Sequence, residues 1–171
     1  MSGSLVRVAE NNVTSSVNSV SLTGIDDTFN VYKLIMSGVL PDTDAISMKL
    51  RFTVSGTPDT SSNYDRAFVN LRADTAFGDI QDTNQDHINI GSIGTAGNEI
   101  MNGIFYLYNF SDAGENSFCS LEASIRNDGS NLRGFQGGAI LTENQSTDGV
   151  NFTCTSGDIS TGRFVLYGIR A

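Results

Sequence analysis

The stretch STGRFVLYGIR, residues 160–170, decides the fold of this chain. Successive side chains of a strand point to opposite faces, so Val165 would lie on one face and Phe164 and Leu166 on the other. Apolar side chains on both faces are typical of a strand that is covered on both sides. The pattern predicts a final strand in the middle of its sheet, with Gly168 at a bulge or a close backbone approach.

Shorter runs of the same kind occur along the rest of the chain. The clearest covers residues 46–54, where apolar side chains alternate with serine, lysine, arginine and threonine, and a longer run covers residues 99–109. We expect about nine or ten short strands, because turn signals recur at the ~8–12-residue spacing of sandwiches and barrels. The sequence therefore predicts an all-β protein, an antiparallel β-sandwich of the jelly-roll type.

The sequence predicts a short N-terminal segment followed by one domain. Residues 1–16 are polar and lack a clear period, which predicts an N-terminal arm or a weak edge strand. Residues 17–171 form a single β-sandwich domain in this interpretation. Within it, residues 64–74 have an ambiguous period and are interpreted as a strand, while residues 75–86 are interpreted as a polar loop.

Composition restricts the function classes. Only 39% of residues are hydrophobic and 17% charged, and turn-forming residues make up the difference, which favours many short strands over helices. The net charge of −9 argues against nucleic-acid binding and against anionic membranes, since both need a basic surface. We expect no signal peptide and no membrane span, hence synthesis in a cytoplasm, with Cys119 and Cys154 buried and free.

No motif of catalytic chemistry is complete in this sequence. His87 is the single histidine, and no Gly-x-Ser-x-Gly elbow accompanies it, so a Ser-His-Asp triad is not predicted. The acidic stretch at residues 74–86 could bind calcium, but solvated loop carboxylates are the favoured interpretation. We therefore expect no enzyme activity, no catalytic residues, no metal and no cofactor.

Aromatic side chains give the one candidate for ligand contact. Tyr64, Tyr106 and Tyr108 could stack on a carbohydrate, as aromatic residues on the sheets of β-sandwich lectins do. The alternative is that these large aromatic residues belong to the core or to a subunit interface.

A resemblance to a known class of proteins adds to this picture. The ending GRFVLYGIR, residues 162–170, resembles the ending of small virion structural proteins of tailed bacteriophages, notably those of marine cyanophages. Further stretches similar to these proteins follow one another in order from about residue 20 to the end of the chain. They are FNVYK at 29–33, LPDTD at 40–44, LRFTVSGTP at 50–58, LRGFQGG at 132–138 and TSGDI at 155–159.

The resemblance implies a component of the particle surface, made in the host bacterial cytoplasm and located in the virion. We expect a head decoration or accessory subunit, attached to the major capsid protein or to tail components through its arm, where Leu5, Val6, Arg7 and Val8 would contact the partner. The alternative is a tail-fibre tip or a carbohydrate-binding module that recognises a glycan of the host surface. A homotrimer is the expected assembly, because closed symmetry shields edge strands.

Overall fold

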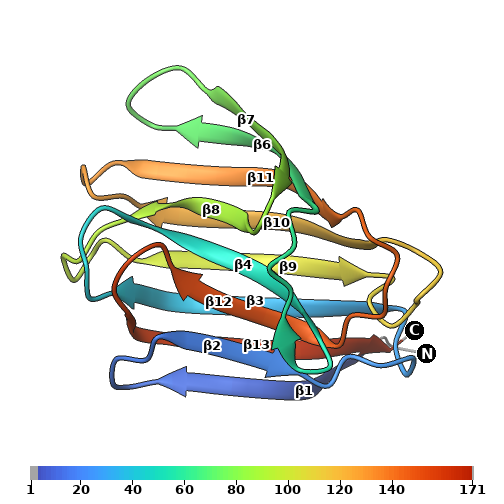
Figure 1. The fold of residues 1–171 in the computed structure, drawn as a ribbon. Helices are drawn as coiled ribbons and strands as arrows, with labels where there is room; N and C mark the ends of the chain where they lie inside the picture. Colours follow the sequence, from blue (N-terminus) through green and yellow to red (C-terminus); the bar gives the residue numbers. More distant parts are fainter. Residues whose placement is uncertain (1–3, 171) are drawn as a thin grey trace.

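The computed structural model describes residues 4–170, and these residues form strands and no helix (Figure 1). The strands lie in two antiparallel sheets that face each other. They are β1 (Ser4–Val13), β2 (Ser19–Thr23), β3 (Val31–Pro41), β4 (Ile46–Val54), β5 (Thr57–Pro58), β6 (Tyr64–Arg72), β7 (Gly78–Gln85), β8 (Ile88–Ile93), β9 (Met101–Tyr108), β10 (Ser117–Arg126), β11 (Leu132–Leu141), β12 (Gly149–Cys154) and β13 (Ile159–Arg170).

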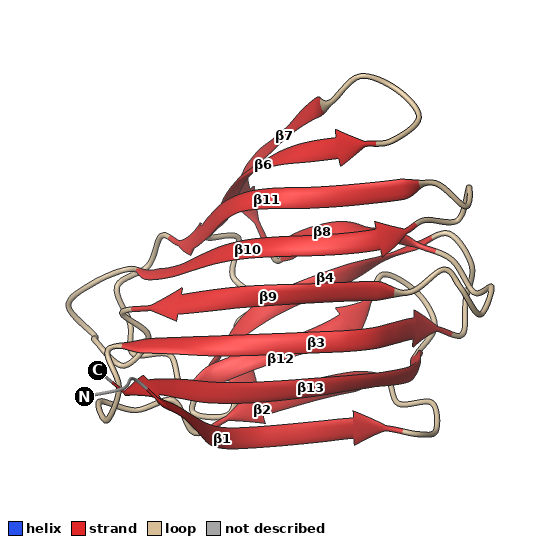
Figure 2. Ribbon diagram, turned by 180° about the vertical axis from the view of Figure 1, so that it is seen from behind, coloured by secondary structure: helices blue, strands red, loops and turns tan. Residues whose placement is uncertain are grey.

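The order of the strands is that of a jelly roll. The eight-stranded sheet has the order β1-β13-β3-β9-β10-β11-β6-β7 (Figure 2), and the five-stranded sheet has the order β2-β12-β4-β5, with β8 also paired to β4. The strands β1-β13-β3-β9 and β2-β12-β4-β8 are the two halves of an eight-stranded jelly roll. Two inserted hairpin pairs, β6–β7 and β10–β11, widen the first half into the larger sheet.

The final strand lies in mid-sheet, as predicted, between β1 and β3. Phe164 and Leu166 of β13 are fully buried between the two sheets. Gly168 is at a close approach, because a Cβ atom there would overlap the ring of Phe29. The strand predicted at residues 46–54 coincides with β4, and the prediction for residues 99–109 contains β9.

The structure shows strands in both polar segments. For residues 1–16 the edge-strand alternative is confirmed over residues 4–13 and the arm is corrected, because β1 pairs with β13 from Ser4 opposite Arg170 to Val13 opposite Gly162. It docks because Val8 and Ala9 contact the core and Val13 is only 5% exposed. Residues 1–3 lie outside the described part of the chain.

The predicted loop at residues 75–86 contains β7, which pairs with β6. Its one apolar side chain that contacts the core is Ile80, so the segment has no visible hydrophobic period. The ambiguous stretch at residues 64–74 does form a strand, β6, which pairs with β7 and β11.

Aromatic side chains join the two sheets in the core. The ring of Phe152, on β12, lies 5.9 Å from that of Phe105 and 5.2 Å from that of Phe164, both on the larger sheet. Cys119 and Cys154 are buried and free, as predicted. Burial raises the pKa of both thiols, that of Cys154 to about 11, so neither is poised to react as a thiolate.

Candidate functional site: the outer face of the eight-stranded sheet

The two sheets differ in what they present to the outside. An antiparallel sheet with one face in water alternates between apolar inward and polar outward side chains. The five-stranded sheet follows this rule. Its outward side chains are Ser19, Ser21, Thr23, Ser47, Lys49, Arg51, Thr53, Asn151 and Thr153.

The eight-stranded sheet breaks the rule. Seven large hydrophobic side chains are exposed among the described residues. Six of them point outward from this sheet, because they alternate with buried residues of their strand or pair with outward residues of the next strand. These six are Leu5, Val69, Leu71, Ile104, Phe118 and Leu132. The seventh, Phe77, precedes β7. We call the outward side of the eight-stranded sheet, which carries these six residues, the apolar outer face.

Rows of directly paired residues show how the apolar outer face is built. One row runs across the sheet from Tyr167 of β13 through Lys33, Tyr106 and Ser120 to Gly138 of β11, and continues to Ala67. The next row contains Val31, Tyr108, Phe118, Ile140 and Asp65. Large side chains therefore stand beside a stretch of small ones.

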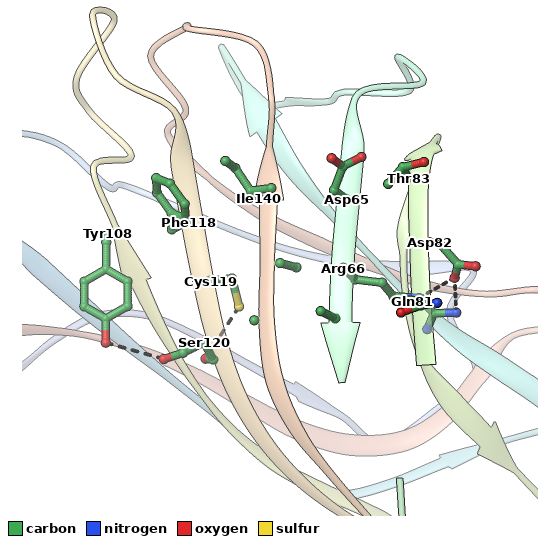
Figure 3. A pocket seen from close by; sticks show the side chains of 13 residues that line it. Asp65, Arg66, Gln81, Asp82, Thr83, Tyr108, Phe118, Cys119, Ser120 and Ile140 are labelled. Carbon is green, nitrogen blue, oxygen red and sulfur yellow. Dashed lines mark hydrogen bonds and ion pairs between the residues drawn. The ribbon is translucent and has the colours of Figure 1, made fainter. Parts of the chain in front are cut away.

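The small side chains form the floor of a hollow. Ser120, Gly138 and Ala67 are paired neighbours on three adjacent strands, while Phe118 and Ile140 stand beside them (Figure 3). The hollow has a volume of about 990 Å³ and extends to Gln81 and Thr83 of β7. This volume is at the upper end of the range of small-molecule pockets.

A second hollow lies on the same face. Its volume is about 560 Å³, and Ile35, Ile104, Leu71 and Gln136 contribute to its lining. Gln136 donates a hydrogen bond of 3.3 Å from its amide nitrogen to Oε1 of Glu122. The apolar outer face thus combines exposed apolar groups with a few polar groups across five neighbouring strands.

The structure divides the three predicted tyrosines. Tyr106 and Tyr108 lie on the apolar outer face, half-buried; the ammonium group of Lys33 lies 5.4 Å from the Tyr106 ring centroid, and the Tyr108 hydroxyl is 3.4 Å from that of Ser120. The prediction that Tyr64 contacts a ligand is wrong, because its side chain points into the core and is only 1% exposed.

The hydroxyl of Tyr64 is hydrogen-bonded to backbone groups inside the protein. It accepts a hydrogen bond of 3.0 Å from the backbone N–H of Phe52 and donates one of 3.2 Å to the carbonyl of Asp59. Burial raises the pKa of this hydroxyl well above its usual range. Contact between Tyr64 and a carbohydrate is therefore ruled out in this fold.

The residues of the predicted arm are spread along the edge strand. Arg7 forms an ion pair of 2.5 Å with Glu10 of its own strand. Glu10 also accepts a hydrogen bond of 2.8 Å from Arg163, and this bond holds its pKa below the ordinary value. Leu5 is exposed, whereas Val6 and Val8 are partly buried, so the four residues form no common contact surface.

The remaining candidates for chemistry belong to structural contacts. His87 Nδ1 lies 2.6 Å from Oδ1 of Asp86, and Asp86 Oδ2 lies 2.5 Å from Arg51; no described serine is hydrogen-bonded to this histidine. Within residues 4–170, no group of three or more histidine, cysteine or acidic side chains is arranged to bind a metal. The described chain also has no helix of the length and hydropathy needed to cross a membrane.

Comparisons with protein-family models, curated proteins and solved structures give no match to this chain.

Proposed function

We propose that this protein is a structural subunit of the bacteriophage particle surface, and that it assembles through the apolar outer face. The observation that carries the proposal is the contrast between two outer faces of one sandwich. Six exposed apolar side chains gather on the larger sheet, while the smaller sheet presents serine, threonine, asparagine and basic residues. Monomeric proteins rarely expose large contiguous apolar patches, and such patches mark interaction sites.

A homotrimer is the proposed assembly. Covering the apolar outer face removes apolar area from water, which stabilises the assembly by about 25 cal/mol per Å² buried. In a closed symmetric assembly, no copy of this face stays exposed. In this proposal the neighbours on the particle are the major capsid protein or tail components. Attachment occurs through the sandwich, because the described part of the expected arm is integrated into the sheet as β1.

The experiment compares two variants that each remove one exposed phenylalanine. Phe118→Ser removes a 42% exposed ring from the apolar outer face, and Phe77→Ser removes a 67% exposed ring outside it. We expect light scattering to show a trimer for the wild type and for Phe77→Ser, and a monomer for Phe118→Ser. A monomeric wild type at micromolar concentration would contradict the proposed assembly.

The position on the particle needs a separate measurement. We expect a side-chain-resolution reconstruction of the virion to place this subunit on the head, with the apolar outer face covered by neighbours. A location at the tip of a tail fibre would support the alternative role, and a chain that is missing from the particle would remove the virion proposal.

A second candidate function is carbohydrate recognition. Tyr106, Tyr108 and Phe118 stand on one face beside Ser120 and Glu122, and aromatic rings beside hydroxyl and carboxylate groups are suited to sugars. In this case Tyr108→Ala should abolish binding on a glycan array, whereas Tyr64→Phe should not. Equal binding by the wild type and Tyr108→Ala would exclude this face as the sugar site.

A further inference from the structure

A further pocket lies where the smaller sheet ends, away from the apolar outer face. Strand β8 forms an edge of that sheet, and β6 and β7 continue beyond it (Figure 1). Three inward positions of β6 are polar, Arg66, Asn70 and Arg72, whereas the other two, Tyr64 and Phe68, are buried in the core. A pocket of about 350 Å³ opens here between β6, β8 and β11.

The charge of this pocket is opposite to that of the whole chain. The protein has 19 acidic and 10 basic residues, yet three arginines line the pocket and no carboxylate of the described chain does. They are Arg66, Arg72 and Arg133. We call this the arginine pocket.

Two of the three arginines are engaged by carboxylates outside the lining. Arg66 donates from Nε to Asp82 across 2.6 Å and also reaches the carbonyl of Asn89 at the β8 edge. Arg133 binds both carboxylate oxygens of Asp74, one of them at 3.2 Å. These contacts fix both guanidinium groups in place.

Arg72 is different. It forms no ion pair within the described residues, and its Nε atom is buried without a hydrogen-bond partner there. Arg72 is also directly opposite Arg133 on the neighbouring strand, and like charges in that position repel. Asn70, only 7% exposed, adds a second unpartnered polar atom, its Oδ1. Buried polar groups are nearly always hydrogen-bonded to protein, water or a ligand, so these two atoms need partners from outside the described chain.

We propose that the arginine pocket binds a small oxyanion, a carboxylate, sulfate or phosphate group, with Arg72 as its main ligand. Guanidinium groups bind such anions through two parallel N–H bonds. An anion here accepts a hydrogen bond from the Nε–H of Arg72 and compensates its charge. The Asn70 amide, turned over, offers an N–H donor from the same wall. A cation is disfavoured because the charge of Arg72 has no ion-pair partner among the described residues, whereas Arg66 and Arg133 are paired with Asp82 and Asp74.

Calorimetric titration tests the proposal with three probes at constant ionic strength: sodium sulfate, sodium phosphate and sodium glucuronate. We expect saturable binding to one site, weakened at least tenfold by Arg72→Gln and unchanged by Arg163→Gln. The control removes the same charge from an exposed arginine of β13. Tighter binding of glucuronate indicates an acidic sugar as the ligand, and tighter binding of sulfate or phosphate indicates a free inorganic anion.

A second measurement uses the unmodified protein and is independent of any folding defect in the variant. With ¹⁵N-labelled arginine, the Nε–H resonance of Arg72 should shift on addition of sulfate, while that of Arg163 should not. The proposal is overturned if none of the three anions binds, if Arg72→Gln binds as well as the wild type, or if the Arg72 resonance stays in place.

Discussion

Thr53 donates its hydroxyl proton to Asp148 across 2.6 Å, and this bond fixes the end of β4 to the segment that leads into β12. Thr53 faces outward on the smaller sheet and is nevertheless fully buried. The other carboxylate oxygen of Asp148 accepts from the backbone N–H of Gly56, and its carbonyl accepts from the N–H groups of Gly24 and Ile25. One residue therefore links the end of β4 with the turns at Gly24 and Gly56 at this end of the sandwich.

Replacement of Asp148 by alanine should lower the free energy of unfolding by about 2–3 kcal/mol, because the buried Thr53 hydroxyl loses its charged acceptor. Urea denaturation of the variant gives this value. The control is Asp27→Ala, which removes an exposed carboxylate that makes none of these bonds. Equal losses in the two variants would mean that the link does not stabilise the fold.

Replacement of Tyr64 by phenylalanine should cost about 1–3 kcal/mol, because the buried N–H of Phe52 loses its acceptor while the ring remains in place. The matched change Tyr106→Phe, on the half-buried outer face, should cost little. Thermal unfolding of both variants checks this. An unchanged melting temperature for Tyr64→Phe would show that water or another group replaces the hydroxyl.

Deletion of residues 2–13 should destabilise the domain. Residues 4–13 pair with residues 162–170 of β13, and Val13 contributes a buried side chain to the core. Without this segment, β13 presents unpaired N–H and C=O groups, which promote aggregation. We expect a lower melting temperature and reduced solubility by circular dichroism and light scattering. Unaltered melting would instead identify β1 as a detachable strand.

Acid should unfold the protein through carboxylates whose pKa is lowered in the folded state. The pKa of Asp26 is lowered mainly by the backbone N–H of Thr28, and that of Asp74 mainly by Arg133. The unfolded chain takes up protons first, near the ordinary value of 3.8, so this stabilisation is complete above that pH and is lost as the pH falls through the folded pKa.

We therefore expect that titration of these groups does not change the melting temperature between about pH 5 and 7. Below about pH 4 their protonation should lower it. Asp26→Asn should fall less steeply with acid than the wild type, because the amide still accepts hydrogen bonds and does not titrate there. Asp27→Asn should follow the wild type. A pH profile of Asp26→Asn identical to that of the wild type would refute the assignment.

The sequence predicts strands well where one alternation runs unbroken. Residues 46–54 match β4 because apolar and polar side chains alternate throughout. Strand β1 was obscured by the irregularity between Arg7 and Ala9, which shifts the pairing and breaks the alternation within one strand. Strand β7 was obscured because Ile80 is its one apolar contact with the core.

The candidate site was only partly predictable for a related reason. Tyr106 and Tyr108 share a face because they are two residues apart, which the sequence does show. Which face of a strand points inward depends on the opposite sheet, which the sequence of one strand does not show. The prediction therefore placed Tyr64 on the outer face, whereas its side chain is buried. Phe118 was missed because apolar residues on both sides of a strand resemble full burial. The arginine pocket depends on the register between β6 and β11, which the sequence does not specify.

The pairing of Ser4 with Arg170 has a practical consequence for protein engineering. These residues lie on adjacent strands at the same end of the sandwich (Figure 2), so a short linker can join them. A circular permutant that opens in the exposed turn between β10 and β11 should then keep every strand pair of the native fold. A protein fused near Ser4 and another fused near Arg170 would both extend from this end of the sandwich, next to each other.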